Sequence, residues 1–378
     1  MIGYSPPFWA LKGLHLLSLG RAYVRHHDRN RREAGAHMTA FYDRVWREAA
    51  SHLGATYTPL GSGIAELLLG GIKTRVAGNI CPIDDPVTLA IACNRPLTYQ
   101  LLARNGLTIP RFAEFTLKTM DRAIDFMESS PRECVVKPAS GTGGGRGVTT
   151  GIRRRFHLAL AAASAAVYGD NLLIEEQLEG DNYRLLYFDG VLVDAFVRRP
   201  PTVVADGRST VFQLVRRANA ERLRHGFALS QVLLTIDQDM HRTLAKQKLS
   251  LLSRPPEGTI VTLKTVVNEN CGADNTTATH LLCDSIVAAG AKAADALDVR
   301  LAGIDVVTRD PGAPLEESGG AVLEVNTTPG FYYHYYKRDG AFPVAVYVLR
   351  KLLADHPSLY RMTIPRVSSS VHKGQNTC

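Results

Sequence analysis

A glycine-rich run at residues 140–147, Ser-Gly-Thr-Gly-Gly-Gly-Arg-Gly, is the feature that most constrains the fold of this chain. It follows closely on residues 134–138, an apolar run ending in Lys-Pro that predicts a β-strand. Without Cβ atoms in the way, backbone N–H groups can turn toward an anion, which is how such loops cradle phosphates. The run is neither a Walker loop nor a dinucleotide fingerprint, so by itself it also fits an ordinary surface hairpin.

Lys137 favours the phosphate interpretation of this loop. It stands at the end of the predicted strand, three residues before the loop begins to turn, where an ammonium group can reach phosphate oxygens. The alternative is a solvated lysine at a strand end. The spacing to the glycines makes phosphate contact the preferred interpretation.

Three oxygen-bearing side chains form a second cluster far downstream. Glu324 and Asn326 are two residues apart in a predicted strand, so both point to the same face, and Asp305 lies in a neighbouring predicted strand. Mg²⁺ takes one or two carboxylates and completes its octahedron with water and nucleotide phosphates. Such polar groups within apolar strands are costly unless they have partners, and we therefore predict a magnesium site.

Hydrophobic periodicity and turn signals predict an α/β or α+β architecture. Residues 1–90 show helical patterns such as 38–53 between short glycine-rich turns, and residues 198–258 are predicted to be a long, partly helical insertion. Helices are predicted at 96–105 (with Asn94 as N-cap), 121–129, 156–168, 278–297 and 344–353. Strands are predicted at 134–138, 171–176, 183–188, 191–197, 301–307 and 321–326, with a tight Asp-Gly turn at 189–190.

The order of these motifs resembles the ATP-grasp superfamily. The Lys-Pro strand and glycine loop are followed by an acidic strand at 175–176, by Gly-Ile-Asp at 303–305 and by Glu-Val-Asn at 324–326. Residues 198–207, Arg-Arg-Pro-Pro-Thr-Val-Val-Ala-Asp-Gly, and the later Asn268 and Gly272 are similar to the ATP-grasp module of cyanophycin synthetases and to related glutathione-forming ligases. The ordered set is far more specific than any one motif.

The resemblance implies an ATP-grasp fold in which two α+β subdomains hold ATP, preceded by an N-terminal α/β region. The implied units are an N-terminal region at 1–93, a central subdomain with the glycine loop at 94–177, a C-terminal subdomain with the metal site at 178–365, and a tail at 366–378. The chain ends where full cyanophycin synthetases continue into a Mur-ligase-like domain, so we expect a stand-alone relative.

The resemblance also implies which residues hold ATP. The hinge at 175–178 would hold adenine through its backbone and the Glu175 side chain, and Lys137 would contact the α- and β-phosphates. The implied nucleotide-binding positions are Arg95, Lys137, Gly143, Gly144, Gly145, Glu175, Glu176, Leu178 and Asn182.

Two of these positions depart from the family pattern. The family usually has lysine at the position of Arg95, which keeps the charge but alters reach and geometry. It usually has an acidic residue for the ribose hydroxyls at the position of Asn182, and Asp181 is the alternative for that role.

The reacting end of the site follows from the same resemblance. Arg198 would lie near an acyl phosphate, where a guanidinium stabilises developing negative charge, and Lys264 would contact the phosphates from the side opposite Lys137. The implied ligands of two Mg²⁺ ions, for which Mn²⁺ could substitute, are Asp305, Glu324 and Asn326. The aromatic run at 331–336 either lines the substrate end of the cleft or packs a domain edge, with His334 as a candidate base.

Net charge limits the classes of binding partner, and the cysteines indicate the cellular compartment. The net charge of +8 fits an anionic partner, whether nucleic acid, an acidic membrane surface or a nucleotide. No nucleic-acid motif is recognisable, and no stretch approaches the ~20 apolar residues of a membrane span, so neither partner is expected. The six cysteines form no Cys-x-x-Cys pair, which is typical of reduced thiols and indicates a cytoplasmic protein.

Together these features predict an ATP-dependent carboxylate–amine ligase that forms an amide or peptide bond through an acyl phosphate and releases ADP and phosphate. The expected substrates are a small carboxylate and an amine, each an amino acid or a peptide, and a homo-oligomer is left open. The alternative, motivated by Arg95 and Asn182, is an ATP-binding regulatory module with impaired catalysis. For the ligase, we expect Asp305→Ala to remove turnover and leave the fold intact, because it removes an ion's ligand and not core volume.

Overall fold

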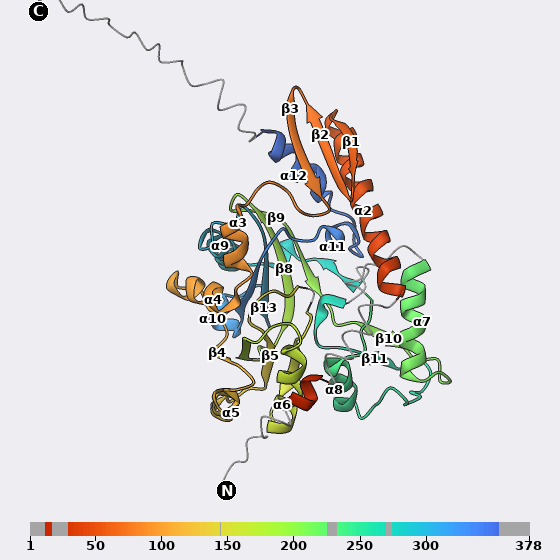
Figure 1. The fold of residues 1–378 in the computed structure, drawn as a ribbon, viewed down its shortest axis with the longest axis vertical. Helices are drawn as coiled ribbons and strands as arrows, with labels where there is room; N and C mark the ends of the chain where they lie inside the picture. Colours follow the sequence, from red (N-terminus) through yellow and green to blue (C-terminus); the bar gives the residue numbers. More distant parts are fainter. Residues whose placement is uncertain (1–11, 17–28, 144, 225–232, 270–273, 355–378) are drawn as a thin grey trace, which may run out of the picture.

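The computed structural model describes residues 12–16, 29–143, 145–224, 233–269 and 274–354. Gly144, one of the predicted loop residues, lies outside these ranges. A three-stranded sheet lies at one end of the molecule, a five-stranded sheet in the middle and a four-stranded sheet toward the other end (Figure 1). Paired strands run antiparallel throughout the described ranges, and helices pack on the sheets, so the predicted α/β (α+β) class is confirmed.

The five-stranded sheet has the order β12-β9-β8-β13-β14. Its strands are β8 (Asp181–Phe188), β9 (Val191–Arg198), β12 (Thr276–Thr277), β13 (Leu301–Thr308) and β14 (Ala321–Thr327). Asp189 and Gly190 join β8 to β9 with positive φ at both residues, as the predicted tight hairpin turn requires. Helix α9 (Asp284–Asp295) packs its apolar residues on one face of the sheet. On the opposite face, Leu186 and Phe188 pack with α2 (Arg29–Leu53) and α12 (Val344–Ala354), and polar side chains follow farther along β8.

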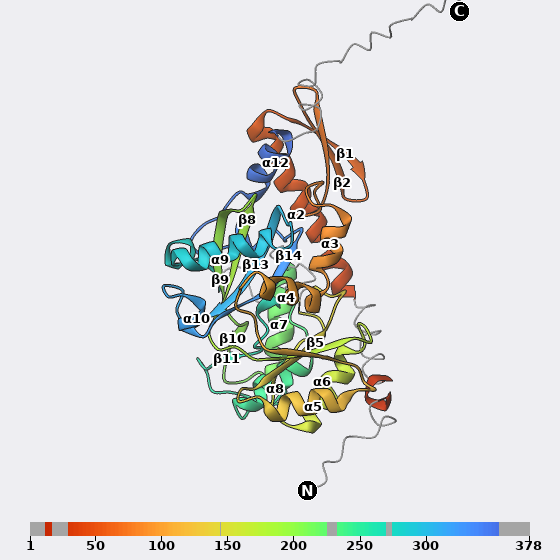
Figure 2. The ribbon, with the colours of Figure 1, turned by 90° about the vertical axis from the view of Figure 1, so that its left-hand side faces the viewer.

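The four-stranded sheet has the order β4-β7-β5-β6 and carries the glycine loop between β5 and β6. Its strands are β4 (Phe112–Phe115), β5 (Cys134–Pro138), β6 (Thr149–Ile152) and β7 (Leu172–Glu176). Helices α5 (Met120–Ser129) and α6 (Arg155–Ala165) bury apolar residues against it and lie together at its outer side in Figure 2. Helices α3 (Pro86–Ala92) and α4 (Arg95–Arg104) pack beside β14, and α4 also contacts β5 and β7 through Arg95 and Tyr99.

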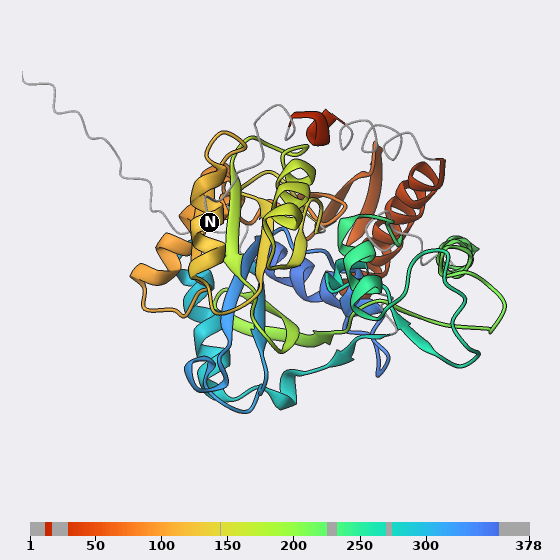
Figure 3. The same cartoon turned by 90° about the horizontal axis from the view of Figure 1, so that it is seen from below.

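The predicted insertion contributes a small unit with its own apolar core. Strands β10 (Thr202–Val204) and β11 (Ile260–Thr262) pair antiparallel. Helices α7 (Val211–Arg224) and α8 (Gln238–Lys246) pack on them, and two short 3₁₀ turns follow at Val267–Glu269 and Thr279–Leu281. Seen from below, α7 (green) and α2 (red, Arg29–Leu53) lie on the same side of the molecule (Figure 3). The partly helical character predicted for residues 198–258 is confirmed.

The helical interpretation of residues 1–90 is wrong for residues 56–77. Strands β1 (Thr56–Gly61), β2 (Ile64–Leu69) and β3 (Ile72–Ala77) form an antiparallel meander that packs with α2 and α12 (Val344–Ala354). In β2, Ala65 and Leu67 are buried while Ile64 and Leu68 are exposed, which is the period of a strand. The glycine-rich turns that seemed to separate helices are hairpin turns, with positive φ at residues 61–63 and 70–71.

Elsewhere the element boundaries follow the sequence signals unevenly. Helix α4 begins where predicted, with the side chain of Asn94 accepting a hydrogen bond from the backbone N–H of Leu97. Helix α9 starts later than predicted, because a 3₁₀ turn and an extended Leu282 precede it. The short strands β4 and β6 were not predicted, and neither were the four-residue helices α10 (Leu315–Ser318) and α11 (Tyr332–Tyr335). None of the helices in the described ranges is long and apolar enough to cross a membrane.

Candidate active site

One face of the five-stranded sheet gathers the side chains predicted to bind metal and acyl phosphate. Asp305 of β13 lies opposite Arg184 of β8 on one side and opposite Glu324 of β14 on the other. Asn182 of β8 lies opposite Arg198 of β9. Directly opposed residues of an antiparallel pair point to the same face, and so do residues two apart in one strand. The predicted residues on this face are Asn182, Arg198, Asp305, Glu324 and Asn326.

Asp305 lies between two buried guanidinium groups. Arg184 donates to both carboxylate oxygens, at 2.5 and 3.0 Å, and Arg198 donates to Oδ1 at 2.9 Å. Burial acts to raise the pKa of Asp305, but the two arginines outweigh it and hold the pKa below its usual range. Burial and the nearby charge of Arg184 lower the pKa of Arg198 to about 10. Arg184 was not predicted, although its position two residues after Asn182 in an alternating strand was a signal for it.

Arg95 connects the glycine loop to the second carboxylate. Its guanidinium donates to the backbone oxygens of Pro138 and Thr142, at 3.2 and 3.1 Å, and to Glu324 Oε1 at 2.8 Å. The predicted departure from lysine thus has a geometric consequence. A guanidinium presents several N–H groups in a fixed plane, whereas an ammonium is a single point charge.

Lys137 and Glu175 form a buried ion pair beside Tyr99. Lys137 Nζ lies 2.8 Å from Glu175 Oε1, and both side chains are less than a tenth exposed. Tyr99, which was not predicted, donates to Glu175 Oε2 at 2.8 Å and accepts from Lys137 at 3.1 Å. Lys137 of β5 and Glu175 of β7, both predicted to contact ATP, are therefore each other's charge partners. A bound nucleotide would have to replace these contacts.

Glu176 points away from the other predicted side chains. It accepts from Arg111 at 2.9 Å and from Ser130 at 3.2 Å, on the side of the four-stranded sheet covered by α5. Glu176 could therefore contact a nucleotide only through its backbone. Leu178, two residues later, is half-buried.

Asn182 retains an unused hydrogen-bond acceptor. Its Oδ1 is inaccessible and has no hydrogen-bond partner among the described residues. A buried carbonyl oxygen without a donor is costly, so a ligand hydroxyl that donates to it would relieve that cost. Asp181, the alternative for the ribose, is exposed.

Lys264 lies in a separate acidic cluster at the start of α8. Its Nζ is 2.6 Å from Asp237 Oδ2 and 3.1 Å from Glu269 Oε2, and the side chain is 2% exposed. Burial acts to lower the pKa of Lys264, but Glu269 and Asp237 outweigh it and raise the pKa above its usual range. The cluster connects to the sheet face through Asn268, which accepts from Arg198 at 2.7 Å.

The described glycines of the loop differ in what they contact. Gly145 has φ +72°, and a Cβ there would lie 2.7 Å from Val266 Cγ1, next to Asn268. At Gly143, where φ is not positive, a Cβ would meet nothing within 4 Å. At Gly145 the loop therefore packs tightly against Val266 and Asn268, and Asn268 is the residue that accepts from Arg198.

We expect Gly145→Ala to lower the free energy of unfolding by about 1–3 kcal/mol, because it adds left-handed strain and a clash with Val266. The matched control Gly143→Ala should stay within about 0.5 kcal/mol of the wild type. Thermal denaturation of both variants measures the difference. Equal stabilities would contradict the packing described for Gly145.

The three predicted magnesium ligands have oxygen donors of the kind that magnesium prefers. Asp305, Glu324 and Asn326 supply two carboxylates and an amide on adjacent strands of one face, which leaves coordination positions for water and phosphate oxygens. Arginines neutralise both carboxylates in this state. In the part of the chain that the structure describes, no group of three or more His, Cys, Asp or Glu side chains is arranged to hold a metal ion.

The aromatic run packs on the same sheet face, against Phe196, and carries a buried histidine. His334 Nδ1 lies 2.7 Å from Asp194 Oδ2, and Lys337 lies 2.8 Å from the other oxygen of that carboxylate. The ring stands edge-on to Phe196, with centroids 4.9 Å apart, and its Nε2 has no hydrogen-bond partner within the described ranges.

Tyr332 and Tyr335 pack with Phe41 of α2, which favours the domain-edge interpretation for them. Tyr333 differs, because its hydroxyl donates to the backbone oxygen of Asn268 at 3.0 Å, beside Arg198.

We expect acid to destabilise the fold through His334. Burial lowers its pKa despite Asp194, and the charges of Arg184 and Lys337 act in the same direction. A lowered folded pKa gives stability that is present above the unfolded value of about 6.5 and is lost as the pH falls below it. Unfolding temperatures at pH 8 to 5 should fall more for the wild type than for His334→Gln. Parallel curves would contradict this origin of the acid sensitivity.

Comparison with known proteins yields relatives of one kind. No protein-family model matches the chain. Cyanophycin synthetase from Nostoc is 30% identical over 254 residues, 66% of this chain and 28% of that protein. The glutathione biosynthesis bifunctional protein GshAB from Streptococcus mutans is 28% identical over 272 residues, 70% of this chain and 35% of that protein. The chain therefore spans about a third of the length of these relatives.

The fold has a counterpart among solved structures. The bifunctional glutathione synthetase from Pasteurella multocida matches 82% of this chain and 43% of that chain, with a TM-score of 0.54 and 22% identity. The chain has two α+β halves. One is a four-stranded sheet with a glycine loop and the other a five-stranded sheet with a carboxylate pair, an arrangement typical of ATP-grasp folds. The chain belongs to the ATP-grasp superfamily and is related to the cyanophycin synthetases and the GshAB proteins.

Proposed function

We propose that this chain is an ATP-dependent carboxylate–amine ligase that joins amino acids or small peptides through an acyl phosphate. The observation that carries the proposal is the convergence of Arg184, Arg198 and Asp305 with Arg95 and Glu324 on one sheet face beside the glycine loop. Ligands of a phosphoryl group and ligands of a divalent cation would then act on the same reacting atoms. The kinship with proteins named for cyanophycin and glutathione synthesis supports amino-acid or peptide substrates.

The paired charges suggest how ATP would enter. In this state Lys137 is neutralised by Glu175, and Arg95 by Glu324. ATP phosphates would replace these carboxylates as the partners of the cations, with Lys137 at the α- and β-phosphates and Lys264 on the opposite side. Mg²⁺, held by Asp305, Glu324 and Asn326, would neutralise charge on the transferring phosphoryl group.

The reaction would proceed in two displacements. A carboxylate oxygen of the acid substrate attacks the γ-phosphorus, and the bond from that phosphorus to the bridging oxygen of ADP breaks. The amine nitrogen then attacks the acyl carbon, the bond to the phosphate oxygen breaks, and the amine loses its proton. Arg198 would hold the acyl phosphate in place, and its guanidinium would balance the charge that develops on the oxygen in the second step.

The runner-up function is a regulatory module that binds ATP without turnover. Arg95 and Asn182 motivated it, but both keep contacts or unused acceptors suited to a nucleotide. A module that only binds also has no need of Arg184 and Arg198 around Asp305, since two buried guanidiniums are costly to hold together. Free thiols at the described cysteines, Cys81, Cys93, Cys134 and Cys283, support a proposed cytoplasmic location.

Hydroxylamine trapping tests the proposal. Each of the twenty protein amino acids is offered as the acid with Mg·ATP, and hydroxylamine replaces the amine. We expect at least one hydroxamate to form in an ATP-dependent manner, and Arg198→Met to slow its formation about 10²- to 10³-fold. ATP binding without any hydroxamate, from single acids or from short peptides, would favour the regulatory module instead.

A further inference from the structure

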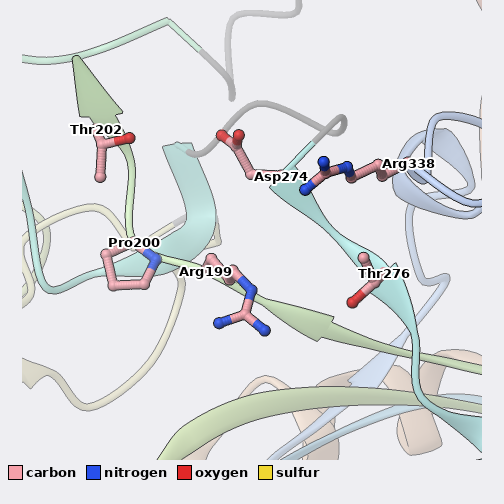
Figure 4. A pocket seen from close by; sticks show the side chains of 6 residues that line it. All are labelled: Arg199, Pro200, Thr202, Asp274, Thr276 and Arg338. Carbon is pink, nitrogen blue, oxygen red and sulfur yellow. The ribbon is translucent and has the colours of Figure 1, made fainter. Parts of the chain in front are cut away.

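A cavity of 450 Å³ lies at the edge of the five-stranded sheet, immediately past Arg198. Figure 4 shows Arg199, Pro200 and Thr202 along one wall, with Asp274, Thr276 and Arg338 across from them. We call it the edge pocket. None of its lining residues belongs to the predicted nucleotide or metal site.

The walls of the edge pocket are fixed by backbone contacts. Thr276 of β12 pairs with Val197 of β9, directly before the arginines. The backbone N–H of Arg338 donates to the carbonyl of Asn275 at 2.8 Å, and the N–H of Thr277 donates to Asp339 at 2.9 Å. The two sides of the pocket are thus tied to one sheet and to each other.

The charges in the edge pocket are arranged unlike those of the nucleotide site. Arg199 and Arg338 are exposed, and neither guanidinium is ion-paired to any residue within the described ranges. By contrast, Arg95, Lys137, Arg198 and Lys264 all have carboxylate partners. Two like charges facing one cavity repel each other, and an anion bound between them would remove that repulsion.

We propose that the edge pocket binds a carboxylate that is not activated in the reaction. The role of this carboxylate in catalysis rests on the proposed ligase function. A planar carboxylate matches the fork of a guanidinium, and the hydroxyls of Thr202 and Thr276 can donate to the same oxygens. Asp274 keeps the net charge of the lining at one positive unit, which favours a monoanion over a phosphate.

Each wall continues a segment that carries a residue of the candidate active site. Arg199 follows Arg198 in the chain, and Arg338 follows the aromatic run that comes after Asn326. The 274–276 wall comes a few residues after Asn268, which accepts from Arg198.

Thr276 pairs with Val197, whose side chain packs on the α9 face, whereas Arg198 points to the opposite face. The pocket therefore adjoins the candidate active site around the edge of the sheet. We assign the carboxylate to a substrate that passes this edge: either the amine substrate, as an amino acid, or an acid substrate with a second carboxylate.

Direct binding tests the pocket without reference to catalysis. N-acetylglycine and N-acetylglycinamide differ in a carboxylate against a carboxamide, and both are titrated into the full chain with ligand-observed NMR. We expect Arg199→Gln and Arg338→Gln each to weaken N-acetylglycine binding about tenfold, the loss expected for a charge-assisted hydrogen bond. Arg104→Gln, an exposed arginine outside the pocket, is the matched control and should bind like the wild type.

The proposal would be overturned if N-acetylglycine and N-acetylglycinamide bound equally well. It would also be overturned if Arg199→Gln and Arg338→Gln both bound N-acetylglycine like the wild type. Both arginines are exposed, so the variants should unfold at the wild-type temperature. Binding losses would then not come from misfolding.

Kinetics with the hydroxylamine assay identify which substrate carries the carboxylate. If it is the amine substrate, Arg199→Gln raises only the KM for the amine and leaves hydroxamate formation unchanged. If it is the acid substrate, the KM for the acid rises with hydroxylamine as well. If neither KM changes in Arg199→Gln, the role of the pocket in the reaction is refuted. If the wild type forms no hydroxamate at all, the ligase function is refuted, but the binding result still stands.

Discussion

Asp305→Ala is expected to lower the free energy of unfolding by about 3–5 kcal/mol and to abolish ligation. The substitution leaves Arg184 and Arg198 buried, close together and without a counter-charge, and stranding a buried ion in this way has a cost of that size. From the sequence alone we expected an intact fold, whereas the buried arginine partners of Asp305 lead us to expect a less stable one. Urea denaturation of the variant measures the stability, and ADP release measures the turnover.

Glu324→Gln separates the two effects of Asp305→Ala. The Glu324 side chain is 27% exposed and has a single arginine partner, so its neutralisation should change stability by no more than about 1 kcal/mol. Turnover should nevertheless be lost, because a carboxylate ligand of the metal is gone. A folded Glu324→Gln enzyme with wild-type turnover would refute the metal site, and wild-type stability of Asp305→Ala would refute the buried ion pairs.

Lys137→Met is expected to weaken ATP binding at least about 100-fold and to destabilise the fold by about 3–5 kcal/mol. Both effects have one cause in the structure, since Lys137 is buried and is the partner of the buried Glu175 carboxylate. The double variant Lys137→Met/Glu175→Gln should recover most of the stability, because an apolar and a neutral polar group replace the ion pair.

ATP affinity should not recover in that double variant, because the phosphate contact remains absent. Equilibrium binding of a fluorescent ATP analogue, measured beside urea denaturation, separates the two quantities. Recovery of both would mean that Lys137 has only a structural role, and recovery of neither would mean that the Lys137–Glu175 pair does not account for the instability.

The parts of the site that the sequence predicted are those governed by local spacing. Glu324 and Asn326 share a face because a strand alternates every two residues, and the loop glycines are recognisable from their density. The roles of these residues in catalysis remain predictions. The meander at 56–77 was missed because its glycine turns were taken as breaks between helices, although burial in β2 alternates.

The arginine partners of Glu324 and Asp305 could not be predicted, because these ion pairs join segments that are far apart in the sequence. Arg95 and Glu324 are 229 residues apart in the chain, and Arg198 and Asp305 are 107 apart. No local pattern brings such groups together; the sheet order β9-β8-β13-β14 and the position of α4 do. The edge pocket was missed for the same reason, since its two arginines come from opposite ends of the C-terminal half.

The fate of the substrate oxygen tests the central claim most directly. An acid that gives a hydroxamate is prepared with ¹⁸O in its carboxylate and is coupled to the amine in the presence of Mg·ATP. Attack by this carboxylate on the γ-phosphorus puts one of its oxygens on the phosphate that leaves. The account predicts that one ¹⁸O atom per turnover appears in inorganic phosphate, with ADP unlabelled. Label in AMP, or inorganic phosphate without label, would contradict it.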